Sequence, residues 1–255
     1  SLKFSPGLEF LASQHSVHDL QSLASVISGL EGDPTKAVIR GLPLLPEKEP
    51  VARQSQNFSS ISHHWCMIDI DSLPWNGDLQ DQKAMLEYAS CQLPPEFQQV
   101  DCWYHFSSSM GIKAGIRVHL WYWLERPCSD AEMKAWLSGC PVDMRLFNPT
   151  QIHLTAYPQF IGGATDPYPN RSGMFEAGNQ ITTVTVPDDI ESKMVSLRAR
   201  SMPRSSSKSG SLDPAEVVAT QQKRGAHAVF RKGQRSLPAG AARQGAIVQP
   251  QKAFR

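Results

Sequence analysis

A nine-residue stretch near the middle of the chain alternates so regularly that it leaves little choice of structure. In residues 116–124, IRVHLWYWL, the even positions are apolar or aromatic, whereas the odd positions hold Arg117, His119 and two tryptophans. Side chains of a β-strand point to opposite faces with a period of two. We therefore predict a strand with one face in a core and another face on which an arginine and a histidine lie side by side.

The segments on either side of this strand predict a regular series of helices and strands. Residues 79–90 contain strong helix formers and no Pro or Gly, and Ser129 and Glu132 have the spacing of a capping box. In chain order, the expected elements are a strand over 65–71, a helix over 79–90, strands over 100–106 and 116–124, a helix from Ser129 to Gly139, and extended segments over 142–147 and 151–157.

The order β-α-β-β-α-β predicts an α+β fold of the ferredoxin-like or RRM-like kind, the split βαβ arrangement. In that arrangement the first and third strands are neighbours at the centre of the sheet, and the fourth strand lies on the other side of the first. Leu20, Leu23, Ile27 and Leu30 have helical spacing. We therefore expect a helical extension before this sheet.

The charges divide the chain into two parts of opposite sign. Residues 191–255 carry thirteen Lys and Arg against three acids, whereas residues 1–190 carry twelve against 21. All six Trp and all five Tyr precede residue 180. We expect residues 1–190 to form one folded domain with its core at about 35–165. Residues 191–255 would then form a basic, largely disordered tail or linker, with a short helix over 213–223.

Composition also sets expectations about partners and cellular location. The basic tail has two interpretations, plain linkage or an arm that binds nucleic acid by displacing counterions from phosphates. The sequence has no uninterrupted apolar run of about 18 residues, which a membrane-spanning helix would need. Five scattered cysteines without a CxxC pair do not suggest a disulfide framework. We therefore expect a cytoplasmic protein.

Two carboxylates on the 65–71 strand carry the strongest chemical signal. Asp69 and Asp71 share a face of that strand, and the predicted sheet places them beside Arg117 and His119. Asp143 would approach the acid pair from the other side. Acids in an apolar strand repel one another unless a cation compensates, and carboxylate oxygens suit Mg²⁺ or Mn²⁺. The pattern predicts a two-metal site of the kind that supports attack at phosphorus.

The connection before the central strand adds a second set of candidates. Residues 107–115 supply three serine hydroxyls, including the candidates Ser107 and Ser109, two glycines and the ammonium group of Lys113. Such a loop is a plausible phosphate cradle beside the histidine strand. An ordinary Ser- and Gly-rich turn is the simpler interpretation of the same residues.

Three segments together are similar to the motifs of a known family. They are MIDID with Asp69 and Asp71, RVHLWYWL with His119, and PVDMRLF with Asp143. Over about residues 35–165 the chain resembles the archaeo-eukaryotic primase superfamily, in particular the primase-polymerase domains of bacterial plasmids, phages and integrative elements. The resemblance implies that the three aspartates bind the metals and that His119 contacts the phosphates of a nucleotide.

The same resemblance implies a reaction and a set of partners. The 3′-hydroxyl of a nucleotide or primer would attack the α-phosphate of an NTP or dNTP on a single-stranded DNA template. Such domains are often fused to a replicative helicase, and a nucleoid-associated location in bacteria follows. The second motif has Arg117 where Ser is usual. Either Arg117 contacts phosphate itself, or Ser107–Ser109 take the serine's role. Glu125 and Asp166 are alternatives to Asp143 as the third acid.

Two other functional classes remain as alternatives. A replication initiator or relaxase of the His-hydrophobic-His type needs two histidines around one apolar residue and a nucleophilic tyrosine, and the strands here contain single histidines. A non-catalytic nucleic-acid-binding module would leave Asp69 and Asp71 unexplained.

Four further residues have open roles. Trp121 and Trp123 either stack on bases or pack under a second layer, His153 either touches a nucleotide or is structural, and Arg40 either contacts template or triphosphate or is a surface charge.

Overall fold

The computed structural model describes residues 9–47, 49–201 and 244–250, which form an α+β fold of helices and antiparallel sheets. This class is the one that the sequence predicts. The helices are α1 (Leu20–Ser28), α2 (Gln82–Ser90), α3 (Asp130–Trp136) and α4 (Ile190–Ser201). Short 3₁₀ turns are η1 (Ser55–Asn57), η2 (Pro95–Phe97) and η3 (Met144–Leu146).

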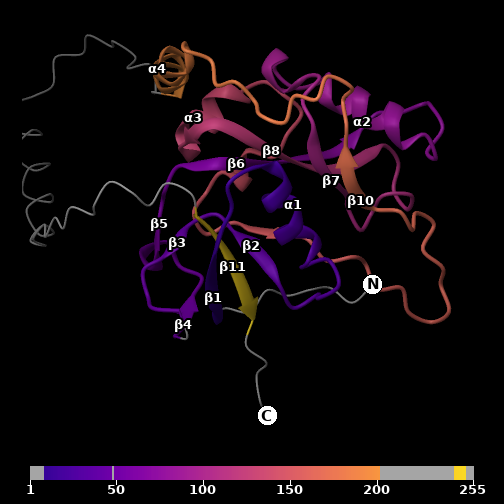
Figure 1. The fold of residues 1–255 in the computed structure, drawn as a ribbon, viewed down its shortest axis with the longest axis horizontal. Coiled ribbons are helices and arrows are strands. Elements are labelled where there is room, and N and C mark those ends of the chain that lie inside the picture. The colour runs from indigo at the N-terminus through magenta and orange to yellow at the C-terminus, as the bar shows by residue number, and fades with distance from the viewer. Residues whose placement is uncertain (1–8, 48, 202–243, 251–255) are drawn as a thin grey trace, which may run out of the picture.

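A four-stranded antiparallel sheet organises the fold (Figure 1). Its strand order is β10-β7-β8-β6, from Ser172–Phe175 through Cys102–Phe106 and Ile116–Cys128 to His63–Leu73. The first predicted strand, β6, therefore pairs with the third, β8, and β8 pairs with the second, β7. The pairing of β6 with β8 agrees with the sequence prediction.

The expected fourth strand does not join this sheet. Residues 142–147, expected to be extended, contain the 3₁₀ turn η3, because the Asp143 carboxylate accepts a hydrogen bond from the Arg145 backbone and closes the turn. Residues 151–157 form only the three-residue strand β9 (Ile152–Leu154). β9 pairs with β2 in another sheet, and β6 is the last strand of its own sheet.

The N-terminal part is a second layer with its own sheet rather than a helical extension alone. That sheet has the order β4-β1-β11-β2-β9. Its strands are β1 (Glu9–Ser16), β2 (Ala37–Ile39), β4 (Pro50–Ala52), β9 and β11 (Gln244–Pro250). A small pair, β3 (Leu42–Pro43) with β5 (Phe58–Ser59), lies nearby in sequence. These strands are mostly two or three residues long, so they leave little periodic signal in the sequence.

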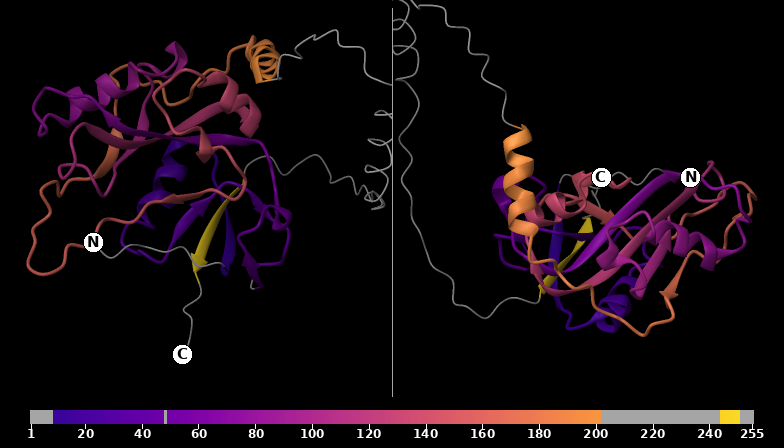
Figure 2. Two further views of the ribbon diagram at one scale, coloured as in Figure 1. Left: turned by 180° about the vertical axis from the view of Figure 1, so that it is seen from behind. Right: turned by 90° about the horizontal axis from the view of Figure 1, so that it is seen from above.

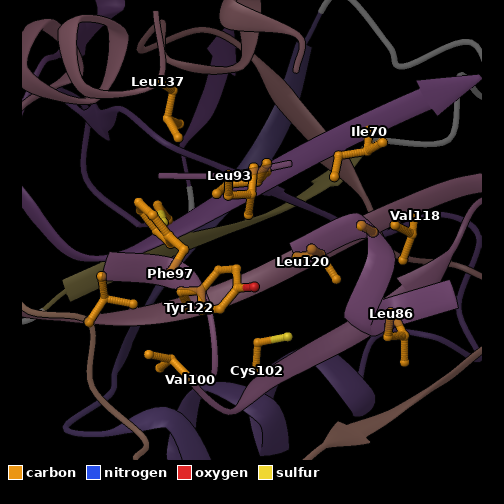
Figure 3. Close-up of a cluster of buried hydrophobic side chains, with 14 of the residues drawn as sticks. Ile70, Leu86, Leu93, Phe97, Val100, Cys102, Val118, Leu120, Tyr122 and Leu137 are labelled. Carbon is orange, nitrogen blue, oxygen red and sulfur yellow. The ribbon is translucent and has the colours of Figure 1, made fainter. Parts of the chain in front are cut away.

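Helices cover both faces of the central sheet. Even-numbered side chains of β6 and β8 enter a core with α2 and α3, part of which Figure 3 shows. Odd-numbered residues at one end of the opposite face, such as Trp121 and Trp123, pack beneath α1. Figure 1 shows α2 and α3 on one side of the sheet and α1 on the other. The two tryptophans are buried, so the packing interpretation is confirmed and base stacking is wrong for them.

Arg40 links the two layers. From the sequence, this residue is expected either at a nucleotide or as a surface charge. It follows β2, is almost fully buried and forms an ion pair with Asp130 at the start of α3. Its guanidinium also donates to the carbonyls of Trp65 and Cys128. A buried guanidinium needs this number of acceptors, because each unsatisfied N–H would cost free energy.

The segment expected to be a disordered tail contains two ordered parts within the described residues. Residues 190–201 form α4, which lies beside α3 and projects at one edge of the molecule (Figure 2). Residues 244–250 form β11, whose backbone pairs with β1 on one side and β2 on the other. The predicted helix over 213–223 lies outside the described residues. No helix in the described part combines the length and hydropathy needed to span a membrane.

Candidate active site

The odd-numbered face of the central sheet changes from apolar to polar along its strands. On β6 the residues run Trp65, Met67, Asp69, and the first two are buried under α1. On β8 their direct partners are Trp123, Trp121 and His119. The polar end of this face begins where the apolar cluster beneath α1 ends, and the candidate site lies there.

One row of residues crosses all four strands at the start of the polar end. Ser172 on β10 is opposite His105 on β7, His105 is opposite His119 on β8, and His119 is opposite Asp69 on β6. Beyond the sheet edge, the backbone N–H of Asp143 donates to the carbonyl of Asp69 at 3.1 Å. Residues more than 100 positions apart are thus placed in one line.

Asp69 and His119 face each other at the centre of the site. The distance from His119 Nε2 to Asp69 Oδ1 is 3.6 Å, and the side chains are 14% and 25% exposed respectively. Burial raises the pKa of Asp69, His119 opposes that rise, and the negative charges of Asp71 and Asp143 add to it. Burial lowers the pKa of His119 against the opposing effect of the two β6 carboxylates. Both groups are thereby driven towards their neutral forms.

Asp71 is held by Arg117, the residue that departs from the family pattern. Arg117 forms an ion pair with Asp71 and also donates to the Ser72 hydroxyl. The register of β6 against β8 shifts between Ile70 and Leu73, and Ser72 has a φ of 67°. This bulge places the Asp71 carboxylate at the surface, where its side chain is 63% exposed.

Asp143 reaches the acid pair from the open edge of β6, as expected, although through a turn and not a strand. Arg145 binds its carboxylate through Nε at 3.0 and 3.1 Å and through a terminal nitrogen at 2.8 Å. These hydrogen bonds lower the pKa of Asp143. Arg145 itself is exposed, so this guanidinium can leave without breaking any buried contact.

The 107–115 loop lies between β7 and β8, beside the Arg117 end of the site. Ser107 donates its backbone N–H to the carbonyl of Arg117, and the Ser107 and Ser109 hydroxyls are 3.1 Å apart. Gly115 has a φ of 81°, and a Cβ there would lie 2.7 Å from the Leu73 carbonyl. The glycine therefore allows the loop to pass close to the β6 bulge. Lys113 is exposed on this loop.

The two alternative third acids are not part of the cluster. Asp166 accepts hydrogen bonds from the buried Arg171. Arg171 in turn donates to the Ser107 carbonyl at 2.6 Å and so helps to fix the 107–115 loop. Glu125 lies six residues beyond His119 along β8, which corresponds to about 20 Å in an extended strand. Of the three candidates, Asp143 is the one whose backbone contacts Asp69.

The carboxylates have the right chemistry for a hard cation but are currently paired with arginines. Within residues 9–47, 49–201 and 244–250, no three His, Cys, Asp or Glu side chains lie together as a set of metal ligands. Asp71 faces Arg117 and Asp143 faces Arg145. Their oxygens are the ligands that Mg²⁺ and Mn²⁺ prefer, and a bound cation would relieve the repulsion that raises the pKa of Asp69. Such an ion would replace an arginine partner.

Comparisons with known proteins do not extend this picture. No family model, curated protein or solved structure matches the chain. The site must therefore be interpreted from its own geometry.

Two residues of the site have no part in the sequence prediction. His105 points from β7 onto the polar face, and burial lowers its pKa to about 3, with His119 and Arg171 contributing. Period-two alternation with the core residue Phe106 could have indicated this orientation. Glu31 follows α1 and accepts a hydrogen bond from Tyr157 at 2.8 Å. No local pattern marks it, because its partner lies 126 residues away.

His153 is a structural histidine, the second of its two interpretations, although it lacks the hydrogen bonds that such a residue usually makes. It is 1% exposed, packs edge-on against the rings of both Trp65 and Trp121, and both ring nitrogens lack a hydrogen-bond partner among the described residues. Burial holds its pKa well below the ordinary value. A neutral imidazole in an aromatic pocket is in no position to contact a phosphate at the surface.

Proposed function

We propose that this protein is a metal-dependent nucleotidyltransferase, a DNA primase or primase-polymerase, and that its central sheet is a ferredoxin-like palm without a paired fourth strand. The archaeo-eukaryotic primase resemblance suggests this activity. The observation that carries the proposal is the direct opposition of Asp69 and His119 on neighbouring strands. Asp71 lies two residues further along β6, and the Asp143 backbone binds the Asp69 carbonyl.

Each residue has a role that follows from its chemistry. Asp69, Asp71 and Asp143 would hold Mg²⁺ or Mn²⁺, which neutralises charge on the attacking and leaving oxygens of a phosphoryl transfer. His119, at the centre of the row, would donate a hydrogen bond to a phosphate oxygen. Arg117 is already oriented towards the acid pair and would turn to phosphate once a cation neutralises Asp71.

The 107–115 loop would complete the binding of the phosphates. The hydroxyls of Ser107 and Ser109 lie together, and Lys113 is exposed nearby in the same loop. Hydroxyl and ammonium donors of this kind bind phosphate oxygens. The implied partners are single-stranded DNA, an NTP or dNTP, and a fused or associated helicase, in a bacterial cytoplasm near the nucleoid. The basic residues 191–255 would strengthen template binding electrostatically.

A primer-synthesis assay with each nucleotide set, a single-stranded template and Mg²⁺ or Mn²⁺ tests this function. Asp69→Asn with Asp71→Asn should abolish incorporation. Glu87→Gln should leave it unchanged, because Glu87 is an exposed carboxylate of α2, the helix on the opposite face. Equal activity in the wild type and the double aspartate variant would refute the assignment of the site, and an inactive wild type would refute the proposed activity.

One observation favours a second candidate, a replication initiator or relaxase. The fold brings His105 and His119 together, with ring centroids 5.7 Å apart, and places the Tyr157 ring 5.8 Å from His105. A tyrosine oxygen would attack a DNA phosphate, forming a phosphotyrosyl bond as a 3′-hydroxyl leaves. A covalent protein–DNA adduct on a denaturing gel, lost in Tyr157→Phe, would favour this candidate over the polymerase.

A further inference from the structure

Tyr157 combines an exposed ring with a hydroxyl that is fixed to the protein. The side chain belongs to a residue that is 41% exposed. Its hydroxyl donates to Glu31 Oε2 at 2.8 Å and lies 2.6 Å from the Ser172 hydroxyl. Its backbone N–H also donates to the Glu31 carbonyl at 2.9 Å. A surface tyrosine normally leaves its hydroxyl to water. Tyr157 instead makes two contacts through its hydroxyl and one through its backbone N–H.

The contacts that hold Tyr157 require a buried carboxyl, which is unfavourable for stability. Glu31 is only 6% exposed, and burial raises the pKa of its carboxyl against hydrogen bonds that include the one from Tyr157. Its second oxygen, Oε1, is buried and has no partner among the described residues. An incompletely satisfied buried carboxyl destabilises a fold. The arrangement stiffens the ring, which is of use where the exposed face receives a ligand.

Tyr157 lies at the opposite end of the residue row from the acid pair. Ser172, its hydroxyl partner, is the far end of the row that runs through His105 and His119 to Asp69. Three strand spacings of about 4.8 Å separate the two ends, a span of about 14 Å. That length exceeds a phosphate group and is comparable with a whole nucleotide. A ligand with phosphates at Asp69 could therefore extend to Tyr157.

We propose that the exposed face of Tyr157 is a stacking platform for a nucleobase, with Glu31 and Ser172 as its positioning residues. The identity of the ligand rests on the proposed function. The carboxyl of Glu31 disfavours phosphate at this end and leaves the base as the part of the ligand that fits. The base comes either from the nucleotide or from the single-stranded template.

Binding measurements on paired probes test the platform without requiring turnover. The probes are ATP against inorganic tripolyphosphate, both with Mg²⁺, and a thymidine oligonucleotide against its abasic counterpart. Stacking on an aromatic side chain contributes about 1–3 kcal/mol per base, which corresponds to an affinity loss between about 5-fold and about 150-fold. Tyr157→Leu should weaken at least one base-containing probe by this factor and leave the two base-free probes unchanged. The probe that responds identifies the source of the base.

Two variants control the interpretation. Tyr157→Phe retains the ring and should lose less affinity than Tyr157→Leu. Tyr88→Leu should change nothing, because Tyr88 is a comparably exposed tyrosine, at 38%, on α2 across the sheet. The proposal is overturned if Tyr157→Leu leaves both base-containing probes unaffected or weakens the base-free probes equally.

A measurement on the wild-type protein covers the case in which Tyr157→Leu does not fold. Photocrosslinking with 8-azido-ATP and with a 4-thiothymidine oligonucleotide, followed by peptide mapping, should label Tyr157. Labels found only elsewhere would overturn the platform. Failure of the proposed function is distinguishable from this result. A wild-type protein that makes no primer, yet binds bases through Tyr157, refutes the polymerase and retains the platform.

Discussion

Replacing His105 should make the protein less sensitive to acid. His105 is 2% exposed, and both ring nitrogens lack a hydrogen-bond partner among the described residues. Burial, together with smaller contributions from His119 and Arg171, lowers its pKa from 6.5 to about 3. The folded protein therefore keeps this imidazole neutral under conditions in which the unfolded chain protonates it.

The sign and size of the effect follow from that difference in proton binding. Below pH 6.5 the imidazole of His105 binds a proton in the unfolded chain, whereas in the folded chain it binds a proton only below about pH 3. The unfolding free energy therefore falls as the pH falls through this window. Between pH 7.0 and 5.5 the contribution of this one group amounts to about 1.3 kcal/mol of lost unfolding free energy. Glu31 and Asp69, whose pKa values are raised, act in the opposite direction, but they are present in both the wild type and the variant.

Urea unfolding, followed by tryptophan fluorescence at pH 7.0 and 5.5 and constant ionic strength, measures this quantity. The loss of stability between the two pH values should be smaller in His105→Leu than in the wild type by about 1.3 kcal/mol. His18→Gln is the control, because His18 is exposed, and it should behave as the wild type does. An equal loss in wild type and His105→Leu would refute the assignment of a buried, neutral His105.

Two further predictions concern the arginines. Arg40→Met leaves Asp130 buried without its cation and should lower the unfolding free energy by about 3–5 kcal/mol in a urea titration, with recovery in the double variant Arg40→Met and Asp130→Leu. No recovery would show that packing of Arg40 dominates. Arg145→Ala frees the Asp143 carboxylate and should tighten Mn²⁺ binding in a calorimetric titration. Weaker binding in that variant would exclude Asp143 as a ligand released by Arg145.

The face on which the site lies was predictable because the signal is local. Alternation along 116–124 and 65–71 assigns each side chain to a face, and a one-residue error would reverse the whole assignment. The structure therefore has Asp69 opposite His119, as alternation and the expected strand order require. The helix after Ser129 begins with the predicted capping box for a similar reason, since its hydrogen bonds join residues three positions apart.

The parts of the fold that could not be predicted depend on contacts between residues far apart in the sequence. β9 is three residues long and pairs with β2, more than 100 residues earlier, so its own sequence holds no information on which sheet it joins. Asp143 reached the expected neighbourhood by a turn that its own carboxylate closes, a conformation that a short apolar segment does not distinguish from a strand. Glu31 and Tyr157 meet for the same long-range reason.

The place of the site follows from the size of the helix that covers the rest of its face. α1 has nine residues and is therefore about 14 Å long, whereas β8 has thirteen residues and extends about 43 Å. Side chains of one face recur about every 6.6 Å along a strand, so a single helix of this length can cover only part of the face. The apolar cluster that includes α1 also contains Trp121 and Trp123 on β8 and Trp65 and Met67 on β6. The next position on each strand lies outside this cluster. There the sequence changes to His119 and Asp69, because side chains at the edge of the covered area can keep a polar atom near water.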